Sequence, residues 1–235
     1  MPLTMLEELD TEKLEQRGEG KKYAILMAGL KLFGEYGLKG TSVRMIADEA
    51  GANVAAIPYY FTNKENLYIE VVTYIGEQIS HHMSEVRMHA GPIIEKEELT
   101  KEEAMEVLQM MLHNMAKILV ESDEPKAWAQ IIMREQANPT EAFDVIYEQF
   151  MKPMQKIAGK CVAAYMELDS ESDEVKIRIH ALKGQVLGFL VSRECLLRNL
   201  GVKKLTHTHY NLIYQVIAAH IEACLGRSIQ VSGNR

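Results

Sequence analysis

The side chains of this sequence that could perform chemistry include eight histidines and 33 carboxylates, which together could hold a metal ion. A two-metal site inside a helical bundle requires Glu-x-x-His pairs on facing helices. No histidine here has a glutamate three residues before it, and the adjacent His81 and His82 point about 100° apart on a helix. The sequence also lacks a Gly-x-Ser-x-Gly elbow, a His-Glu-x-x-His pair and a dinucleotide-binding fingerprint. We therefore predict a protein that is not an enzyme and that holds no metal and no other cofactor.

A different chemistry, the binding of DNA, fits the residue types between Thr41 and Leu67. Arginine and lysine bind phosphates and base edges, whereas small side chains allow close approach to bases. We expect Arg44 to contact a base edge or a phosphate. Tyr60 and Lys64 are expected to hold phosphates, and Ala55, Ala56 and Tyr59 to meet bases. The complete predicted DNA-binding set is Thr41, Arg44, Asn53, Ala55, Ala56, Tyr59, Tyr60 and Lys64.

Two short helices must position these side chains. The first is indicated by apolar residues spaced as on one helical face, with Thr41 or Ser42 as a cap: Val43, Ile46, Ala47 and Ala50. Gly51 suits a left-handed helix end, and Asn53 suits the N-cap of the second helix. That helix would bury Ile57 and Phe61 and present its other face to the major groove. The pattern is typical of a helix-turn-helix.

A third helix is predicted to follow, because Thr62 and Glu65 have the spacing of a capping box. From Asn63 to Ala90 a stripe of apolar residues predicts one long helix: Leu67, Val71, Ile75, Ile79, Met83 and Val86. This helix would connect the DNA-binding part to the rest of the chain. Pro92 and the acidic residues after it indicate a loop, and Thr100 is the expected cap of the next helix.

At these residues the sequence resembles the TetR family of transcriptional regulators. The positions that match the family's signature are Thr41, Arg44, Ile46, Ala47, Ala50, Gly51, Tyr60, Phe61, Lys64 and Leu67, preceded by Ile25, Leu26, Leu32, Phe33 and Gly37. Further on, the segments MREQANPTEAFDVIYEQFMKP and HALKGQVLGFLVSRE resemble the C-terminal domain of the CecR-type branch. The resemblance implies an all-α protein with an N-terminal DNA-binding domain and a helical ligand-binding and dimerisation domain.

Two residues depart from the family pattern. Gly29 stands where alanine is usual, which costs roughly 1 kcal/mol in a helix interior. Pro58 replaces an aromatic residue in the second helix of the helix-turn-helix, where it removes one N–H and disfavours helical geometry at Ile57. We expect the end of that helix to be loosened or tightened to a 3₁₀ turn.

The distribution of charge supports the predicted division into three parts. Although the net charge is −7, bases outnumber acids between Lys21 and Tyr68, as phosphate binding requires. Residues 1–20 are acidic and are predicted to form a mobile arm, residues 21–67 the DNA-binding domain, and residues 68–235 the ligand-binding and dimerisation domain. Cysteine usage and the absence of a long apolar run favour a cytoplasmic protein without a membrane span.

Five more helical segments are expected in the third part, at about 101–121, 125–137, 140–167, 172–199 and 205–225. An effector pocket should be mostly apolar with few polar groups. The residues predicted to line it are Met111, Met115, Trp128, Arg134, Tyr147, Phe150 and Met151. For Arg134 two roles stay open, the binding of an anionic ligand or an ion pair with Glu135, Glu141 or Asp144.

Gly184 and Gly188 lie inside a predicted helix, which indicates that a second helix approaches closely and contacts Ala181, Leu187, Val191 and Cys195. The family resemblance implies a homodimer formed by the last two long helices. The favoured function is a transcriptional regulator, specifically a repressor. It binds a palindromic DNA operator and is released by a small-molecule effector. The alternative is a helical small-molecule-binding protein without DNA-binding activity, suggested by Pro58.

Overall fold

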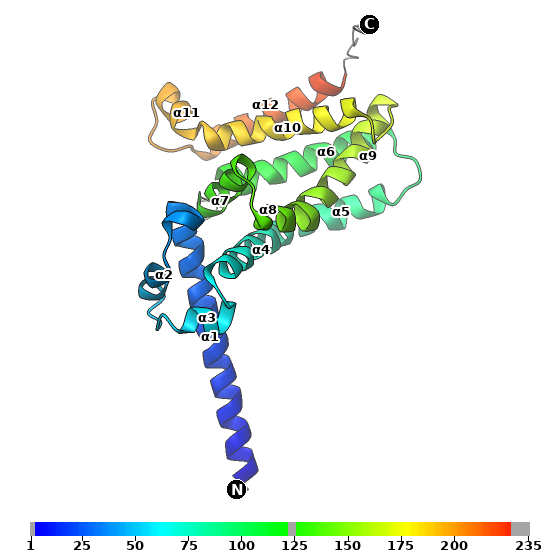
Figure 1. Ribbon diagram of the computed structural model, residues 1–235. Coiled ribbons are helices and arrows are strands. Elements are labelled where there is room, and N and C mark those ends of the chain that lie inside the picture. Colours follow the sequence, from blue (N-terminus) through cyan, green and yellow to red (C-terminus); the bar gives the residue numbers. More distant parts are fainter. Residues whose placement is uncertain (1–2, 122–125, 227–235) are drawn as a thin grey trace, which may run out of the picture. The chain divides into compact units, whose positions relative to one another are not determined.

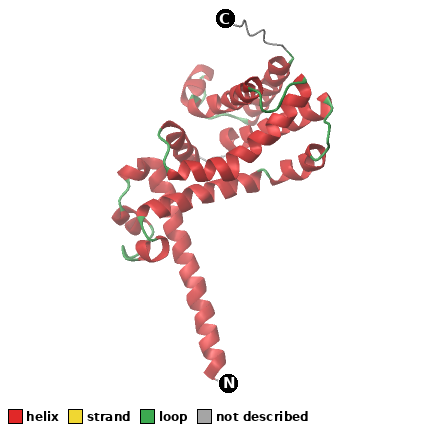
Figure 2. Cartoon of the chain, turned by 45° about the vertical axis from the view of Figure 1, so that its right-hand side comes forward, coloured by secondary structure: helices red, strands yellow, loops and turns green. Residues whose placement is uncertain are grey.

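The computed structural model describes residues 3–121 and 126–226, and all regular structure in these ranges is helical (Figures 1 and 2). The helices are α1 (Leu3–Gly40), α2 (Val43–Glu49), α3 (Ala56–Phe61), α4 (Lys64–His82), α5 (Ser84–Ile94), α6 (Lys101–Ala116), α7 (Lys126–Ala137), α8 (Glu141–Ile146), α9 (Lys152–Met166), α10 (Asp173–Val191), α11 (Arg193–Leu200) and α12 (His207–Leu225). Two π-helical turns, η1 (Lys117–Glu121) and η2 (Tyr147–Met151), interrupt this order. The predicted all-α class is confirmed. Among these helices none is both long and apolar enough to cross a membrane.

The helices agree with the five segments expected after residue 100, with breaks added. The segment 140–167 consists of α8, η2 and α9, and the segment 172–199 consists of α10 and α11. The single helix expected from Asn63 to Ala90 is wrong, because α4 ends at His82 and α5 starts at Ser84. Capping was predicted better: Thr100 forms a complete capping box with Glu103 at the start of α6.

The chain forms two compact units, whose limits differ from the predicted domain boundaries. The first unit comprises Met1–Glu77 and Glu124–Tyr147, and the second comprises Gln78–Asp123 and Glu148–Arg235. Helix α1 continues through residue 20, where the arm was expected to end. Helices α7 and α8 belong to the first unit because α7 packs along α1, where Gly34 lets the two backbones meet: a Cβ on Gly34 would lie 2.8 Å from the Cβ of Ala127.

Each unit has its own apolar interior. In the first, α1, α4 and α7 surround fully buried side chains that include Phe33, Leu67 and Ile131. Gly29 is a helix-interior glycine of α1. A Cβ added to it would lie 3.3 to 3.5 Å from side-chain atoms of Phe33, Leu67 and Val71. In the second unit α6 packs against α5, α9, α10 and α12. The interior of the first unit fixes the position of α2 and α3.

Candidate DNA-binding surface and effector residues

The helix-turn-helix is built as its capping residues predict, with one change. The Ser42 hydroxyl accepts a hydrogen bond from the Met45 N–H at 3.2 Å and so caps α2. Gly51 has the left-handed conformation expected of it, with φ 58°. The Asn53 side chain accepts from the N–H of Ala55 at 2.9 Å, before α3 begins, so Asn53 stabilises the turn rather than capping the helix. The prediction of Asn53 as an N-cap is therefore wrong.

Helix α3 is a regular α-helix despite Pro58. Its apolar side chains Ile57 and Phe61 are buried, as predicted. Pro58 is the third residue of α3, a position where a backbone N–H has no intrahelical partner, so the N–H missing from proline removes no helical hydrogen bond. The Val54 carbonyl, four residues earlier, accepts a hydrogen bond from the Ile57 N–H. At the other end the Thr62 N–H donates to the Pro58 carbonyl at 3.1 Å, an α-helical bond. The expected loosening or 3₁₀ tightening of this helix does not occur.

Four of the predicted DNA-binding residues are accessible on α2, α3 and the turn between them. The Arg44 side chain is 86% exposed, with only a 4.0 Å contact to Asp48. Tyr59 is 80% exposed, and its ring lies edge-on to that of Tyr60, with centroids 4.8 Å apart. Asn53 and Ala55 are exposed as well, whereas Ala56 and Tyr60 are half-buried. These residues remain predicted DNA contacts.

Two other predicted contacts have their polar groups engaged inside the first unit. Thr41 is buried, and its hydroxyl donates to the carbonyls of Leu32 and Gly37 at 3.1 and 2.8 Å. The Lys64 ammonium donates to the carbonyls of Leu38 and Thr41 at 2.9 and 3.0 Å. Both side chains thus satisfy carbonyls at the end of α1 and in the loop that follows, so neither is directed at a DNA phosphate.

The start of α4 is capped by a residue other than the predicted one. Thr62 has a positive φ of 68° and follows α3 as its C-cap. The Asn63 side chain accepts from the Asn66 N–H at 2.7 Å, which is the bond of an N-cap. The capping box of Thr62 and Glu65 is therefore wrong, because a residue with this backbone conformation cannot also begin the next helix.

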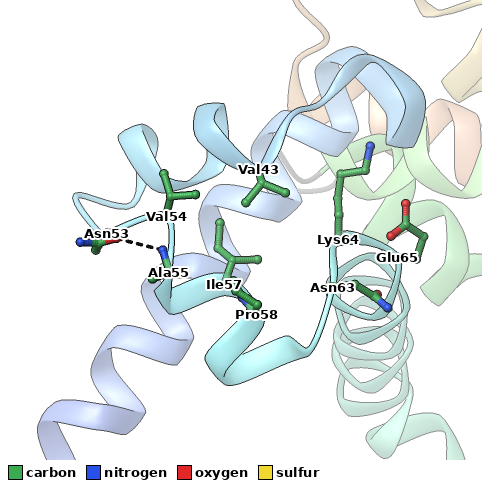
Figure 3. A pocket seen from close by; sticks show the side chains of 9 residues that line it. All are labelled: Val43, Asn53, Val54, Ala55, Ile57, Pro58, Asn63, Lys64 and Glu65. Atoms are coloured by element: carbon green, nitrogen blue, oxygen red, sulfur yellow. Dashed lines mark hydrogen bonds between the residues drawn. The ribbon is translucent and has the colours of Figure 1, made fainter.

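An open hollow of about 720 Å³ lies between α2, α3 and the first turn of α4 (Figure 3). Its lining is mostly apolar and includes Val43, Val54 and Pro58, which the sequence analysis did not assign to DNA binding. Val54 is 46% exposed. Its position just before α3, in a segment with small neighbours, is the signal that could have identified it.

The predicted effector residues are divided between the two units. Trp128, Arg134 and Tyr147 belong to the first unit, and Met111, Met115, Phe150 and Met151 belong to the second. Trp128 is only 6% exposed. The four residues of the second unit are half-buried, on α6 and η2.

Among the described residues Arg134 contacts backbone carbonyls rather than Glu135, Glu141 or Asp144, the partners considered for an ion pair. Its guanidinium donates to three backbone carbonyls near the end of α1, those of Phe33, Gly34 and Glu35, at 2.7 to 2.9 Å. These carbonyls lose their helical partners where Gly37 leaves helical geometry, with φ 73° and ψ 173°. Arg134 is therefore a cap of α1 that comes from a distant part of the sequence.

The neighbouring Glu135 is buried and has a complete set of hydrogen bonds. It accepts from the Tyr68 hydroxyl at 2.8 Å and from the Thr140 N–H and hydroxyl, both at 2.9 Å. Burial of Tyr68, followed by its hydrogen bond to this carboxylate, raises the pKa of the phenol well above its usual range. This network joins α4, α7 and the cap of α8 within the first unit.

Comparison with known proteins assigns the chain to a family. The model for bacterial regulatory proteins of the tetR family matches residues 25–71, and the model for the C-terminal domain of the HTH-type transcriptional dual regulator CecR matches residues 104–227. The chain is 33% identical over 214 residues to the HTH-type transcriptional dual regulator CecR of Shigella flexneri, covering 89% of this chain and 93% of that protein. The chain belongs to the TetR family.

Other known proteins share either the DNA-binding segment or the fold with this chain. The HTH-type transcriptional regulator RutR of Escherichia coli K12 is 42% identical over 65 residues, 28% of this chain and 31% of that protein. The structure of AibR in complex with isovaleryl coenzyme A and operator DNA has a TM-score of 0.62 at 16% identity, covering 85% of this chain and 97% of that one. FadR from Bacillus subtilis in complex with stearoyl-CoA has a TM-score of 0.56 at 16% identity, covering 84% and 97%.

This TetR-family protein is a DNA-binding transcriptional regulator and not an enzyme, as the sequence predicted. The helix-turn-helix described above is the part matched by the tetR model, up to Val71 in α4. The CecR-type match starts in α6 and continues through α12.

Proposed function

We propose that this TetR-family protein is a repressor that binds a palindromic operator as a homodimer and leaves it when a small-molecule effector binds. The proposal places the protein in the cytoplasm, where bacterial operators are. The observation that carries it is an exposed apolar face on α10 and α12, in a molecule whose DNA-reading helix is very short.

The shortness of α3 is the reason for a dimer. With six residues, Ala56–Phe61, this helix can place only a few side chains against base edges. Two such helices, held one DNA turn or about 34–36 Å apart, each read one half of a palindrome. Their free energies of discrimination between right and wrong bases then add. A single copy would bind with little sequence preference.

The exposed face of α10 fits a helix of a second copy. Its residues follow helical spacing, and each is exposed: Ile177, Ala181, Gly184, Gly188 and Val191. Ile177 and Val191 are 67% and 60% exposed, and no atom lies within 4 Å of a Cβ built on either glycine. Because each interior glycine costs about 1 kcal/mol against alanine, a close partner helix is the expected compensation.

Helix α12 has a similar face beside α10 (Figure 1). The two helices are joined by a 3.1 Å contact between His220 Nδ1 and Gln185 Oε1. The exposed apolar residues of α12 are Leu212, Val216, Ala219 and Ala223. We propose that these faces of α10 and α12 pack against their copies about a two-fold axis, which buries all of them at once.

For the effector we propose an acyl-coenzyme A thioester, since AibR and FadR, which have this fold, were each solved with one. The half-buried Met111 and Met115 of α6, with Phe150 and Met151 of η2, offer adaptable apolar surface for an acyl chain. Arg134 is not included, because its guanidinium caps α1.

Titration with isovaleryl-CoA and stearoyl-CoA tests this function. The protein should bind a duplex from the intergenic DNA upstream of its own gene, as a dimer, and one thioester should weaken that binding. Linkage requires that the duplex weaken thioester binding by the same factor, typically 5–150-fold, which calorimetry on free and DNA-bound protein measures. Equal thioester affinities in the two titrations would contradict release by this effector.

A further inference from the structure

We propose that the hollow between α2, α3 and the start of α4 recognises thymine by its 5-methyl group, so that Val54 and its neighbours set the operator sequence. The inference rests on the proposed binding of an operator and adds the chemistry by which this protein reads it. Three observations support it: the apolar lining of the hollow, the engagement of its polar groups, and its place on the DNA-reading motif.

The apolar part of the hollow comes from three successive pieces of the motif. Val43 lies on α2, Val54 in the turn, and Pro58 on α3, and Figure 3 shows their side chains around one space. Ile57 is fully buried beneath them, whereas Val54, Ala55 and Pro58 are exposed. The surface offered to a base edge is therefore composed of methyl and methylene groups.

Three polar residues of the hollow use part of their hydrogen-bonding groups within the protein. Asn53 accepts from the Ala55 N–H and Asn63 from the Asn66 N–H, each through its side-chain oxygen. The Lys64 ammonium donates to two backbone carbonyls. Glu65 is drawn on the far side of Val43 and Ile57 from Val54 and Ala55 (Figure 3). The end of the hollow at Val54 thus lacks an arginine, lysine or glutamine that could read guanine or adenine, and the polar side chain it offers is the exposed Asn53, whose oxygen already accepts from the Ala55 N–H.

The bases differ in what they would gain from such a surface. In the major groove guanine presents acceptors, cytosine a donor and adenine one of each, whereas thymine also presents a methyl group. An apolar hollow leaves the polar edges of guanine, cytosine and adenine without partners, which is unfavourable. Only the thymine methyl gains free energy by entering it, and each buried methyl is expected to improve affinity about fourfold.

The test is an in vitro selection with the full-length protein on random duplexes, followed by removal of individual methyl groups. The enriched duplex should contain thymines at fixed positions in both half-sites. Replacement of one such thymine by deoxyuridine removes only the methyl, and should weaken binding about fourfold, or roughly 15-fold when made in both half-sites. Deoxyuridine placed outside the protected sequence is the control and should have no effect.

Val54→Ala identifies the residue that is responsible. Since Val54 is half exposed, the variant should fold normally, which circular dichroism checks. It should bind the thymine duplex more weakly than the parent protein does, and it should bind the thymine and deoxyuridine duplexes equally. A deoxyuridine effect that is unchanged in Val54→Ala would refute the role of Val54.

The outcomes separate this inference from the proposed function. If a palindromic duplex is enriched but deoxyuridine binds as well as thymine at every position, reading by the methyl group is wrong and operator binding stands. If no duplex is enriched, the proposed operator binding fails and the inference fails with it.

Discussion

The surface of α2 and α3 and the face formed by α10 and α12 both expose apolar side chains. The two differ in the residues that surround those side chains. Tyr59 and Val54 lie in the segment that also exposes Arg44, a cation whose carboxylate contact, with the exposed Asp48, is as long as 4.0 Å. The stripe of α10, from Ile177 to Val191, consists of apolar and glycine residues, with the exposed His180 beside it. A mixed surface fits a charged polymer with apolar groups in its groove, whereas an uncharged stripe with two glycines fits a helix.

Gly188→Glu should prevent the α10 and α12 face from packing against its copy. Of the proposed substitutions, it should cause the largest loss of operator affinity. The carboxylate has open space in one copy, because nothing lies within 4 Å of the Cβ position, but it would be buried in a dimer. We expect a monomer by analytical ultracentrifugation and a loss of operator affinity of about a thousandfold, the low end of the gap between specific and non-specific binding.

Gly91→Glu is the matched control for this change. Gly91 also lies inside a helix, α5, with nothing within 4 Å of its Cβ position. This variant should stay dimeric and bind DNA normally. A dimeric Gly188→Glu protein would show that α10 does not form the interface.

Glu135→Leu tests the interior that supports the first surface. It leaves the Tyr68 hydroxyl and two donors of Thr140 without an acceptor, which should lower the free energy of unfolding by about 3 kcal/mol. Urea denaturation followed by circular dichroism measures this. Glu141→Leu, at an exposed position of α8, is the control and should change stability little. Equal stability of the two variants would contradict the network.

Arg44→Met and Lys64→Met should act differently on DNA binding, although both residues match the family signature. Loss of Arg44 should reduce the slope of log affinity against log salt by about 0.9, the value for one phosphate. Loss of Lys64 should leave that slope unchanged and lower the free energy of unfolding by about 1.5–3 kcal/mol, since it removes charged hydrogen bonds to Leu38 and Thr41. If Lys64→Met reduced the slope of log affinity against log salt, the Lys64 ammonium of the parent protein would have to leave these carbonyls and bind a phosphate in the DNA complex.

These residues also show what the sequence can predict. Helices appeared where apolar spacing required them, and Ser42, Gly51 and Thr100 acted as local capping rules expect. Such rules concern residues within one turn of each other. Arg134 caps a helix about one hundred positions away, and this contact arises only because α7 packs on α1. No local pattern contains that information.

The same limit applies to the DNA-binding set, in which the structure gives two predicted contacts partners inside the protein. Thr41 and Lys64 have residue types that bind phosphate, and their engagement with backbone carbonyls depends on where α1 ends in space. Val54 was missed for the opposite reason, since its residue type suggests an interior position. The exposure of Val54 beside α3 depends on the tertiary structure, which local sequence patterns do not contain.

Pro58→Ala should have the smallest effect on the first surface, and it tests whether this proline weakens DNA binding. The N–H that alanine restores lies in the first turn of α3, where an N–H has no regular intrahelical partner, so little hydrogen-bonding energy is gained. The variant should lose about 0.4–1 kcal/mol of stability through the greater entropy of its unfolded chain. Pro92→Ala is the contrast: Pro92 lies inside α5, where a restored N–H gains a helical bond and stabilises the protein. Operator affinity of Pro58→Ala, measured by fluorescence anisotropy, should stay within a few-fold of the parent. A protein that bound DNA only after Pro58→Ala would be a small-molecule-binding protein in which this proline has removed the ability to read DNA.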